Sequence, residues 1–297
     1  MPTPAATERP DVGDQAGRTW LITGATSGVG REVARAAARA GARVIAPARD
    51  ADRGQRLLNE LHQARADAVG GSLDLADLSS VRAFCATLEE PIDVLVNNAG
   101  VITPRRRESA EGSELMLGTN FLGPFALTNL LASRVRGRIV VVASNAHRSG
   151  HVDAADPHFR YRRWTTAAAY AQSKLCDMLW ARALQRRLGS GGPDVDVQLA
   201  HPGWAFTNIQ NVTGVRVLDR AVSAVCSVFA QPAATGALPV LTAATADLPV
   251  LSFIGPDGFR QLRGRPERQR PSDLALDNDA AEAVWQLGVR ETGTDVP

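Results

Sequence analysis

The chain has 297 residues, of which 44% are hydrophobic and 22% charged, an ordinary globular composition that excludes a disordered, collagenous or coiled-coil protein. Thirty-three Lys and Arg residues against 31 Asp and Glu give a net charge of +2, which provides no electrostatic field for nucleic acid or acidic lipid. Cys85, Cys176 and Cys226 have neither metal-binding nor disulfide spacing, which indicates a reducing, cytoplasmic compartment and no metal site.

Short apolar runs alternate along the chain with helical patterns. Strands are predicted at 19–23, 44–46, 71–73, 94–96, 138–143 and 196–200, and helices at 31–40, 52–63, 79–88, 114–133 and 165–188. This alternation predicts βαβ units and an α/β fold whose parallel sheet is covered on both faces.

The ends of the chain differ in composition from its centre. Residues 1–15 have no apolar run and are expected to be a flexible N-terminus rather than a signal peptide. We place a single domain at 16–259 and a charged C-terminal extension at 260–297, with one helical pattern at 279–287. The uncharged run 221–246 is long enough to span a membrane, but Pro232, Gly236 and Pro239 favour two helices of a globular protein.

A glycine-rich turn follows the first predicted strand. Gly24, Gly28 and Gly30 have the spacing G-x-x-x-G-x-G and precede a predicted helix. Glycines let the backbone turn tightly and approach a pyrophosphate, whose charge then lies at the helix N-terminus. A turn without a ligand would have the same pattern, but the position in the first βαβ unit favours a dinucleotide site.

The end of the second strand indicates which dinucleotide binds. Ala48 stands where a carboxylate would bind the ribose 2′-hydroxyl of NAD, and Arg49 follows. A forked guanidinium suits a 2′-phosphate, and Ser27 could add a hydroxyl. NADP(H) is therefore favoured over NAD(H). The alternatives are that Arg49 is only a solvated arginine and that Asp50 serves NAD(H).

Tyr170 and Lys174, the single lysine of the chain, lie four residues apart in a predicted helix and share one face. An ammonium beside a phenol stabilises the phenolate, so Tyr170 could exchange a proton with a substrate oxygen. Ser144 closes the apolar strand 138–143, at the edge of the sheet where α/β folds bind ligands. Its hydroxyl would hold the substrate oxygen beside Tyr170, or it would only cap the strand end.

Two further turns have an open interpretation. Asn98, Ala99 and Gly100 follow a strand and form either a cofactor loop or a simple turn. Asn120 lies among Gly and Pro residues that predict a kinked helix, where a carbonyl is freed for water or the Asn satisfies the kink itself. Three histidines form no metal pattern and are interpreted as loop residues: His147, His151 and His158.

Taken in order, these motifs resemble the classical short-chain dehydrogenases/reductases. The resemblance covers about residues 18–259 and implies a Rossmann-type, doubly wound sheet of seven parallel strands. It implies four catalytic residues: Tyr170 as acid/base, Lys174 activating it and holding the nicotinamide ribose, Ser144 orienting the substrate, and Asn120 helping to place a water.

The resemblance also implies a set of cofactor contacts. They are Gly24, Ser27, Gly28, Val29 and Gly30 at the phosphates, Arg49 at the position that marks NADP, Asp74 and Leu75 by the adenine, Asn98, Ala99 and Gly100 along the cofactor, Pro202 and Gly203 against the nicotinamide, and Thr207 near the carboxamide or the pyrophosphate.

A narrower likeness is to the branch that contains the retinol dehydrogenases and protochlorophyllide reductases. Ser144 and Tyr170 are 26 residues apart, about twice the common spacing, and this branch carries a similar insertion with Ala-His after the serine. Asn145 and Trp204 depart from the branch and flank the expected substrate pocket, so its substrate is not carried over. The apolar segment at about 205–231 is expected to be a substrate lid.

These observations predict an NADP(H)-dependent oxidoreductase that acts on a carbonyl or secondary alcohol, as a ketone reductase for a bulky apolar or secondary-metabolite substrate. Two alternatives stay open: reduction of an imine or an activated C=C bond, and an NADPH-sensing binding protein with little turnover. We expect a soluble protein with a small-molecule substrate and no nucleic acid. The helices at 114–133 and 165–188 would form a homodimer unless the C-terminal extension covers them.

Overall fold

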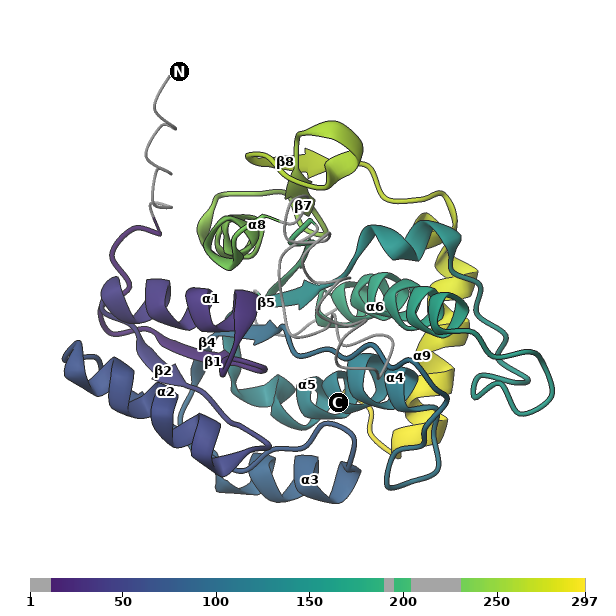
Figure 1. Cartoon of the computed structure of the whole chain (residues 1–297), viewed down its shortest axis with the longest axis horizontal. Coiled ribbons are helices and arrows are strands. Elements are labelled where there is room, and N and C mark those ends of the chain that lie inside the picture. Colours follow the sequence, from purple (N-terminus) through teal and green to yellow (C-terminus); the bar gives the residue numbers. More distant parts are fainter. Residues whose placement is uncertain (1–11, 190–194, 204–230, 297) are drawn as a thin grey trace, which may run out of the picture.

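The computed structural model describes residues 12–189, 195–203 and 231–296, which form one sheet between two layers of helices (Figure 1). The strands are β1 (Thr19–Ile22), β2 (Arg43–Ile45), β3 (Ala68–Val69), β4 (Ile92–Asn97), β5 (Val135–Val142), β6 (Asp196–Ala200), β7 (Phe253–Pro256) and β8 (Pro266–Gln269). The helices are α1 (Gly28–Arg39), α2 (Ala51–Gln63), α3 (Leu78–Thr87), α4 (Leu115–Leu117), α5 (Gly123–Leu131), α6 (Thr166–Leu188), α8 (Ala233–Thr245) and α9 (Asn278–Thr292).

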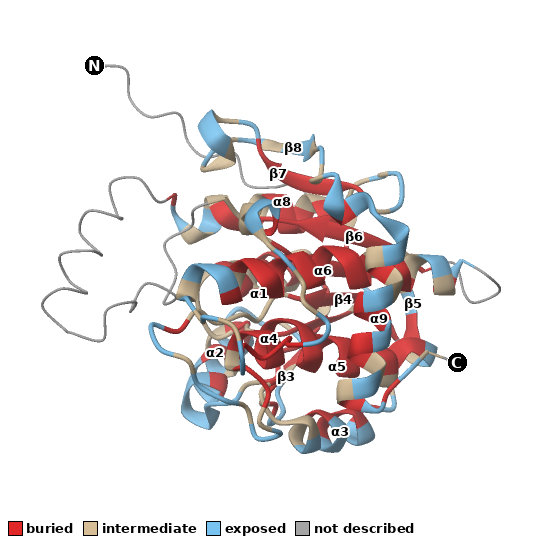
Figure 2. Ribbon diagram, turned by 90° about the vertical axis from the view of Figure 1, so that its right-hand side faces the viewer, coloured by how far each residue is buried: buried red, intermediate tan, exposed pale blue. Residues whose placement is uncertain are grey.

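Alternating side chains of the strands enter two separate hydrophobic clusters, one on each face of the sheet. In β1, Trp20 and Ile22 pack with α1, α2 and α8, whereas Leu21 packs with α3, α5, α6 and α9. Figure 2 shows the buried residues, in red, concentrated where both layers of helices meet the sheet. The predicted doubly wound α/β fold with a parallel sheet is confirmed.

The order of the strands determines where a ligand can bind. The sheet runs β3-β2-β1-β4-β5-β6-β7-β8, and β1 pairs in parallel with both β2 and β4. The chain therefore moves outward from β1 in one direction and then returns to continue in the other. The carboxyl ends of β1 and β4 lie at this switch point, where open α/β sheets have their binding crevice.

The sheet differs from the expected one at both edges. The extended segment predicted at 71–73 is only an isolated bridge between Ala48 and Ser72, and β3 is the two residues Ala68–Val69 just before Gly70 and Gly71. An eighth strand, β8, joins the seven parallel strands and is antiparallel to β7. It comes from the predicted C-terminal extension, so the chain on both sides of residue 259 belongs to the same sheet.

The last helix, α9, packs on α5 and α6. Its Trp285 is fully buried, with its ring 4.8 Å from that of Phe125 in an edge-to-face arrangement. The guanidinium of Arg187 lies 4.1 Å from the Trp285 ring and pairs with Glu282 at 2.8 Å. Because α9 lies against the two helices expected to form a homodimer, the extension covers at least part of that face.

One helical stretch, Leu115–Arg134, is long and apolar enough to cross a membrane. Within the described part of the chain it is the one such helix, and 89% of its most apolar window is buried, as in a core helix. The run 221–246, which the sequence singled out instead, contributes α8 with Pro239 inside it, and its residues 221–230 lie outside the described ranges.

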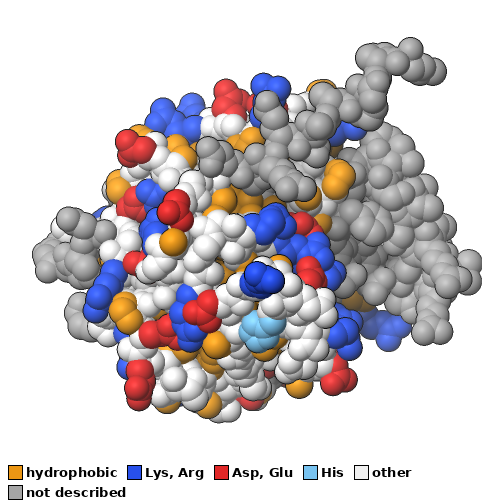
Figure 3. All heavy atoms as spheres, turned by 90° about the vertical axis from the view of Figure 1, so that its left-hand side faces the viewer, with side chains coloured by type: hydrophobic (Ala, Val, Ile, Leu, Met, Phe, Trp, Pro, Cys, Tyr) orange, Lys and Arg blue, Asp and Glu red, His pale blue; other side chains and the backbone are white. Residues whose placement is uncertain are grey.

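The face formed by α1 and α2 carries charges of both signs (Figure 3). Arg31 and Arg35 both pair with Glu60, and Arg35 also pairs with Glu32 at 2.6 Å. The charges of Arg31 and Arg35 are therefore compensated by neighbouring carboxylates.

We expect Trp285→Ala to lower the free energy of unfolding by about 3–5 kcal/mol, because it leaves a cavity between α9 and α5. Urea denaturation measures this, with Leu276→Ala, at an exposed position before α9, as the control. If Trp285→Ala cost no more than the control, α9 would not belong to the cooperatively folded core.

Candidate active site

The turn after β1 is built against the turn after β4. Gly24 and Gly28 have φ angles of 68° and 55°, in the left-handed region that favours glycine. A Cβ on Gly24 would lie 2.8 Å from the Cα of Ala99, and one on Gly30 would overlap the side chain of Asn98. The glycines therefore allow two neighbouring backbones to approach more closely than any side chain permits.

Thr23 and Asn98 fasten these two turns together. The hydroxyl of Thr23 accepts hydrogen bonds from the amides of Asn98 at 3.0 Å and Ala99 at 3.1 Å. In return the Asn98 side chain donates to the carbonyl of Thr23 at 2.9 Å. Asn98 and Ala99, predicted as cofactor contacts, thus also shape the glycine turn. Thr23 was assigned no role from the sequence, although it stands at the end of the first strand, directly before the turn.

The glycine turn fits the pyrophosphate of a dinucleotide. Helix α1 begins at Gly28, directly after Ser27, whose hydroxyl makes no capping hydrogen bond. The first turn of α1 contains no acidic residue, so its N-terminal dipole charge is not compensated there. Val29 is buried and anchors the start of the helix. Free backbone N–H groups and an available hydroxyl are the donors that a phosphate needs.

After β2, Arg49 is exposed to solvent, whereas the carboxylate of Asp50 is used in hydrogen bonding. The Asp50 carboxylate caps α2 by accepting from the amide of Arg53 at 3.0 Å, and it also lies 3.4 Å from the Arg53 guanidinium. That capping bond, and then the charge of Arg53, lower the pKa of Asp50. Within the described part of the chain, Arg49 forms no ion pair.

The loop after β3 lies against α5. Asp74 accepts from the amide of Ala76 at 3.0 Å, and its own amide donates to Ser80 at 2.9 Å. Leu75 is buried, and its carbonyl fills the space that a Cβ on Gly123 would need. Gly123 is therefore what allows the predicted adenine-side residues to lie close to the helix.

Asn120 lies in a π-helical turn, Gly118–Leu122, between α4 and α5. Its side-chain oxygen accepts from the amide of Val101 at 2.7 Å, and its side-chain nitrogen donates to Ser173 at 2.9 Å. Pro124 has no N–H and cannot give the Asn120 carbonyl its α-helical hydrogen bond. The expected kink is thus a widened turn, and because the side chain is occupied, the carbonyl is the group suited to the predicted water.

Helix α6 carries Tyr170 and Lys174. Tyr170 is half-buried and packs in an apolar cluster with Met116, Phe159 and Trp164. Among the described residues its hydroxyl has no hydrogen-bond partner. In the described part of the chain, the phenol therefore has apolar surroundings and an unpaired hydroxyl. Such a hydroxyl can exchange a proton with a substrate oxygen.

The ammonium of Lys174 is buried and held by two oxygens. It donates to the carbonyl of Val142 at 2.8 Å and to the carboxylate of Asp177 at 2.7 Å. Burial alone would lower the pKa of Lys174, but the attraction of Asp177, and then of Tyr170, outweighs burial and raises it. Lys174 therefore stays charged. Gly100 adjoins this site, since a Cβ there would lie 3.8 Å from the Lys174 Nζ and 3.5 Å from the Asn120 side-chain oxygen.

Ser144 follows β5 at the carboxyl edge of the sheet. Its hydroxyl accepts from the amide of Ala146 at 3.2 Å and caps a short 3₁₀ helix, Asn145–Ser149. The alternative role as a strand-end cap is thus present, and it leaves the Ser144 hydroxyl proton available for a substrate oxygen. The side-chain oxygen of Asn145 is buried and has no partner among the described residues.

Of the three histidines interpreted as loop residues, His151 and His158 lie outside helices and strands, whereas His147 lies in the short 3₁₀ helix Asn145–Ser149. Both His147 and His158 are buried. His147 bridges the Ser144 carbonyl at 2.7 Å and the amide of Ser272 at 3.2 Å, and thereby fastens the turn after Ser144 to the C-terminal extension.

After β6, His201 is also buried, and it accepts from the amide of Gly203 at 3.2 Å. Pro202 and Gly203 therefore lie at the carboxyl edge of the sheet, as predicted. Trp204, Thr207 and all of the expected lid except Gln231 lie outside the described residues.

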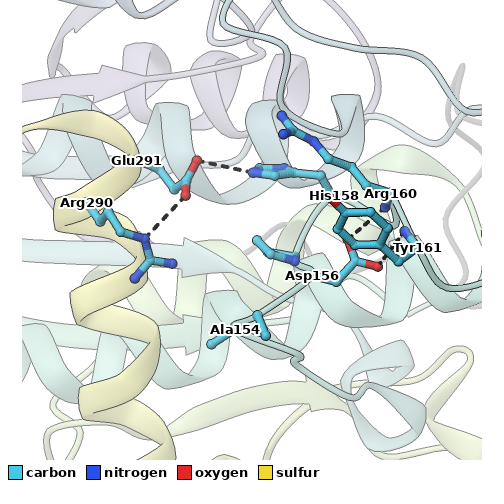
Figure 4. A pocket seen from close by; sticks show the side chains of 9 residues that line it. Ala154, Asp156, His158, Arg160, Tyr161, Arg290 and Glu291 are labelled. Carbon is cyan, nitrogen blue, oxygen red and sulfur yellow. Dashed lines mark hydrogen bonds and ion pairs between the residues drawn. The ribbon is translucent and has the colours of Figure 1, made fainter.

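The insertion between Ser144 and Tyr170 docks on α9 around a hollow of about 420 Å³ (Figure 4). His158 contacts Glu291 of α9 at 3.1 Å, and Asp156 accepts from three backbone amides of the insertion. The hollow is lined by Ala154, Ala155, Asp156, Pro157, His158, Arg160, Tyr161, Arg290 and Glu291. None of the predicted site residues lines it, so we interpret it as the seam of the docked insertion.

Residues 18–215 match the profile of the short chain dehydrogenase family. The chain belongs to this family. It is 38% identical to mouse polyprenol dehydrogenase over 296 residues, 94% of this chain and 85% of the relative. It is 32% identical to human retinol dehydrogenase 13 over 298 residues, 95% and 86% of the two chains.

A solved structure of an uncharacterised protein from Mycobacterium paratuberculosis is 38% identical to this dehydrogenase, with a TM-score of 0.83 and 97% of both chains covered. The predicted family and its retinol-dehydrogenase-like branch are confirmed. The chain is therefore an oxidoreductase of a family that binds nicotinamide cofactors and acts on alcohols and carbonyls.

The burial of His201 predicts a pH-dependent stability. Burial, and then the neighbouring His147 and Arg148, lower the pKa of His201 to about 4. Between pH 6.5 and 4, His201 is therefore protonated in the unfolded chain but neutral in the folded dehydrogenase. The free energy of unfolding falls as the pH falls through this window. We expect a contribution of about 3 kcal/mol from this single group.

Urea unfolding of the wild type and His201→Gln between pH 7 and 4 measures this contribution. The variant should lose less stability on acidification, and His151→Gln, at an exposed position, should behave like the wild type. Parallel curves for wild type and His201→Gln would contradict the assignment.

Proposed function

We propose that this dehydrogenase is an NADP(H)-dependent ketone reductase that converts the carbonyl of a bulky apolar substrate to a secondary alcohol, and can run in reverse. The observation that carries the proposal is the charged, buried Lys174 beside Tyr170. The same ammonium is bonded to the carbonyl of Val142, two residues before Ser144. Tyr170 would therefore serve as the acid/base phenol, Lys174 as its activating charge and Ser144 as the orienting hydroxyl.

The residues of the chain bind, orient and supply the proton, and the bound cofactor would supply the hydride. Ser144 would donate a hydrogen bond to the substrate oxygen and hold it toward Tyr170. Tyr170 would then give its proton to that oxygen as negative charge develops on it. Lys174 stabilises the resulting phenolate by its charge. The Asn120 carbonyl would place the water through which Tyr170 regains its proton.

Two arrangements support NADP(H) rather than NAD(H). Arg49 is exposed and unpaired among the described residues, so its guanidinium is available to a 2′-phosphate. The competing carboxylate, Asp50, is occupied as the cap of α2. The hydroxyl of Ser27, in the glycine turn before α1, makes no capping hydrogen bond and supplies a further donor.

The surroundings of Tyr170 support an apolar substrate. Tyr170 packs against a buried apolar cluster that contains Met116 and Phe159, and Val101, Ile102 and Trp164 pack against the same cluster. A carbonyl that approaches the phenol therefore brings its substituents against apolar walls. The relatives described above are named for polyprenol and retinol, long apolar alcohols, which agrees with this substrate class.

We expect Tyr170→Phe to lower the rate of NADPH oxidation with a ketone substrate by about 10²–10⁴-fold, because the proton donor is lost. The affinity for NADPH, measured by fluorescence titration, should remain within about threefold of the wild type. Tyr161, the other tyrosine of the chain, is exposed, so Tyr161→Phe is the matched control and should be fully active.

A panel of ketones, aldehydes, imines and activated alkenes identifies the bond that is reduced. Turnover of imines or alkenes alone would favour the second reaction class. Tight NADPH binding without turnover of any compound, in wild type and Tyr170→Phe alike, would favour an NADPH sensor.

We expect Arg49→Ala to weaken NADPH binding by about tenfold or more, since an exposed charge-assisted contact to the 2′-phosphate is removed. NADH binding should change by less than twofold, because NADH has no such phosphate. Arg56→Ala, an exposed arginine further along α2, is the control. Equal losses for both cofactors would show that Arg49 does not read the 2′-phosphate.

A further inference from the structure

A buried carboxylate stands directly behind the catalytic lysine. The Asp177 carboxylate lies 2.7 Å from the Lys174 Nζ, and the two side chains are only 2% and 6% exposed. The other Asp177 oxygen accepts from the indole N–H of Trp180 at 3.4 Å. Asp177 is one turn after Lys174 on α6 and belongs to none of the motifs by which the sequence resembles its family.

The ammonium of Lys174 has more N–H groups than its two hydrogen bonds use. A lysine ammonium has three N–H groups and accepts no hydrogen bond. Two of them are used, by Asp177 and by the carbonyl of Val142 at 2.8 Å. Among the described residues the third has no partner. A Cβ on Gly100 would lie 3.8 Å from Nζ, in van der Waals contact. Gly100 has no side chain and therefore leaves this side of the ammonium uncovered.

The charge of Asp177 makes the burial of Lys174 tolerable. An isolated ammonium in a dry interior loses its proton readily, since desolvation disfavours the charged form. Among the described residues, the titratable groups that act on Lys174 are Asp177 and Tyr170, both on α6. No charged group from the strands and helices packed against α6 adds to these two in the described part of the chain.

We propose that Asp177 is a positioning residue that holds the protonated Lys174 against the end of β5, so that one N–H remains for the ribose of the nicotinamide cofactor and the positive charge stays beside Tyr170. This inference rests on the proposed function, because it assumes that Lys174 meets a cofactor ribose. Asp177 touches neither substrate nor cofactor. It acts through the place and the protonation state of Lys174.

The composition of the chain provides a direct test. Because Lys174 is the single lysine among 297 residues, labelling with [ε-¹³C]lysine gives one side-chain resonance, whose pH titration reports the protonation of Lys174 without substrate or cofactor. In Asp177→Asn we expect the titration midpoint of this resonance to fall by one pH unit or more. We also expect the affinity for NADPH, measured by fluorescence titration, to fall by about tenfold or more.

Two variants separate positioning from packing. Trp180→Phe removes the other partner of Asp177 and should leave both readouts within twofold or 0.3 pH unit of the wild type. Asp295→Asn removes a carboxylate that likewise accepts from a tryptophan, Trp285 at 3.1 Å, but it lies just after the end of α9 and has no contact with Lys174 among the described residues, so it should have no effect. If Asp177→Asn does not fold, Asp177→Glu keeps the charge but displaces it, and should weaken NADPH binding while Lys174 stays charged.

Unchanged titration and unchanged NADPH affinity in Asp177→Asn would overturn the proposal, as would unchanged affinity in Asp177→Glu where that variant is the one that folds. Losses in Trp180→Phe as large as in Asp177→Asn would also overturn it, because they would assign the effect to packing. Failure of the proposed function looks different. The wild type itself would then either not bind NADPH or bind it without turnover, while the titration of the cofactor-free protein would still report on the Asp177–Lys174 pair.

Discussion

The close approach of two strand ends, β1 and β4, is the constraint on which the rest of the site depends. At the switch point of the sheet their turns share hydrogen bonds through Thr23 and Asn98. Gly24 and Gly30 make this approach sterically feasible. Because the start of α1 is fixed by the same contacts, its free N–H groups are aimed at the crevice before any ligand arrives. This preorganisation lowers the entropy that binding a long dinucleotide would otherwise lose.

The second requirement is a positive charge in a dry place. In the proposed function Lys174 acts on Tyr170 at low dielectric, which requires burial, and burial by itself would discharge it. The fold meets both demands by placing the carbonyl end of β5 and the carboxylate of Asp177 within hydrogen-bond distance of the ammonium. A rigid sheet edge and one helix thereby control an electrostatic property that no flexible loop could hold constant.

The parts of the fold that the sequence predicted are those with a strong local pattern. The strand 196–200 and the long helix that carries Tyr170 were found because apolar periodicity and burial coincide there. Strand β8 was missed because its residues, Pro266–Gln269, are polar and become a strand only by pairing with β7.

The same limit applies to the site. The spacing of Tyr170 and Lys174 is readable from the sequence, whereas Asp177 could be recognised only once the structure showed that a carboxylate at this position is buried. His147 was missed for the same reason, since its partner, Ser272, is far along the chain.

Helix α9 has a consequence for how the protein is made. It leaves the ribosome after α3, α5 and α6, yet it seals the layer that these helices form. Arg82 of α3 donates to the carbonyl of Thr292, 210 positions later. A nascent chain can therefore form its first βαβ units but must keep the apolar face around Phe125 open until α9 has been synthesised. Until then this exposed face is a natural target for a chaperone.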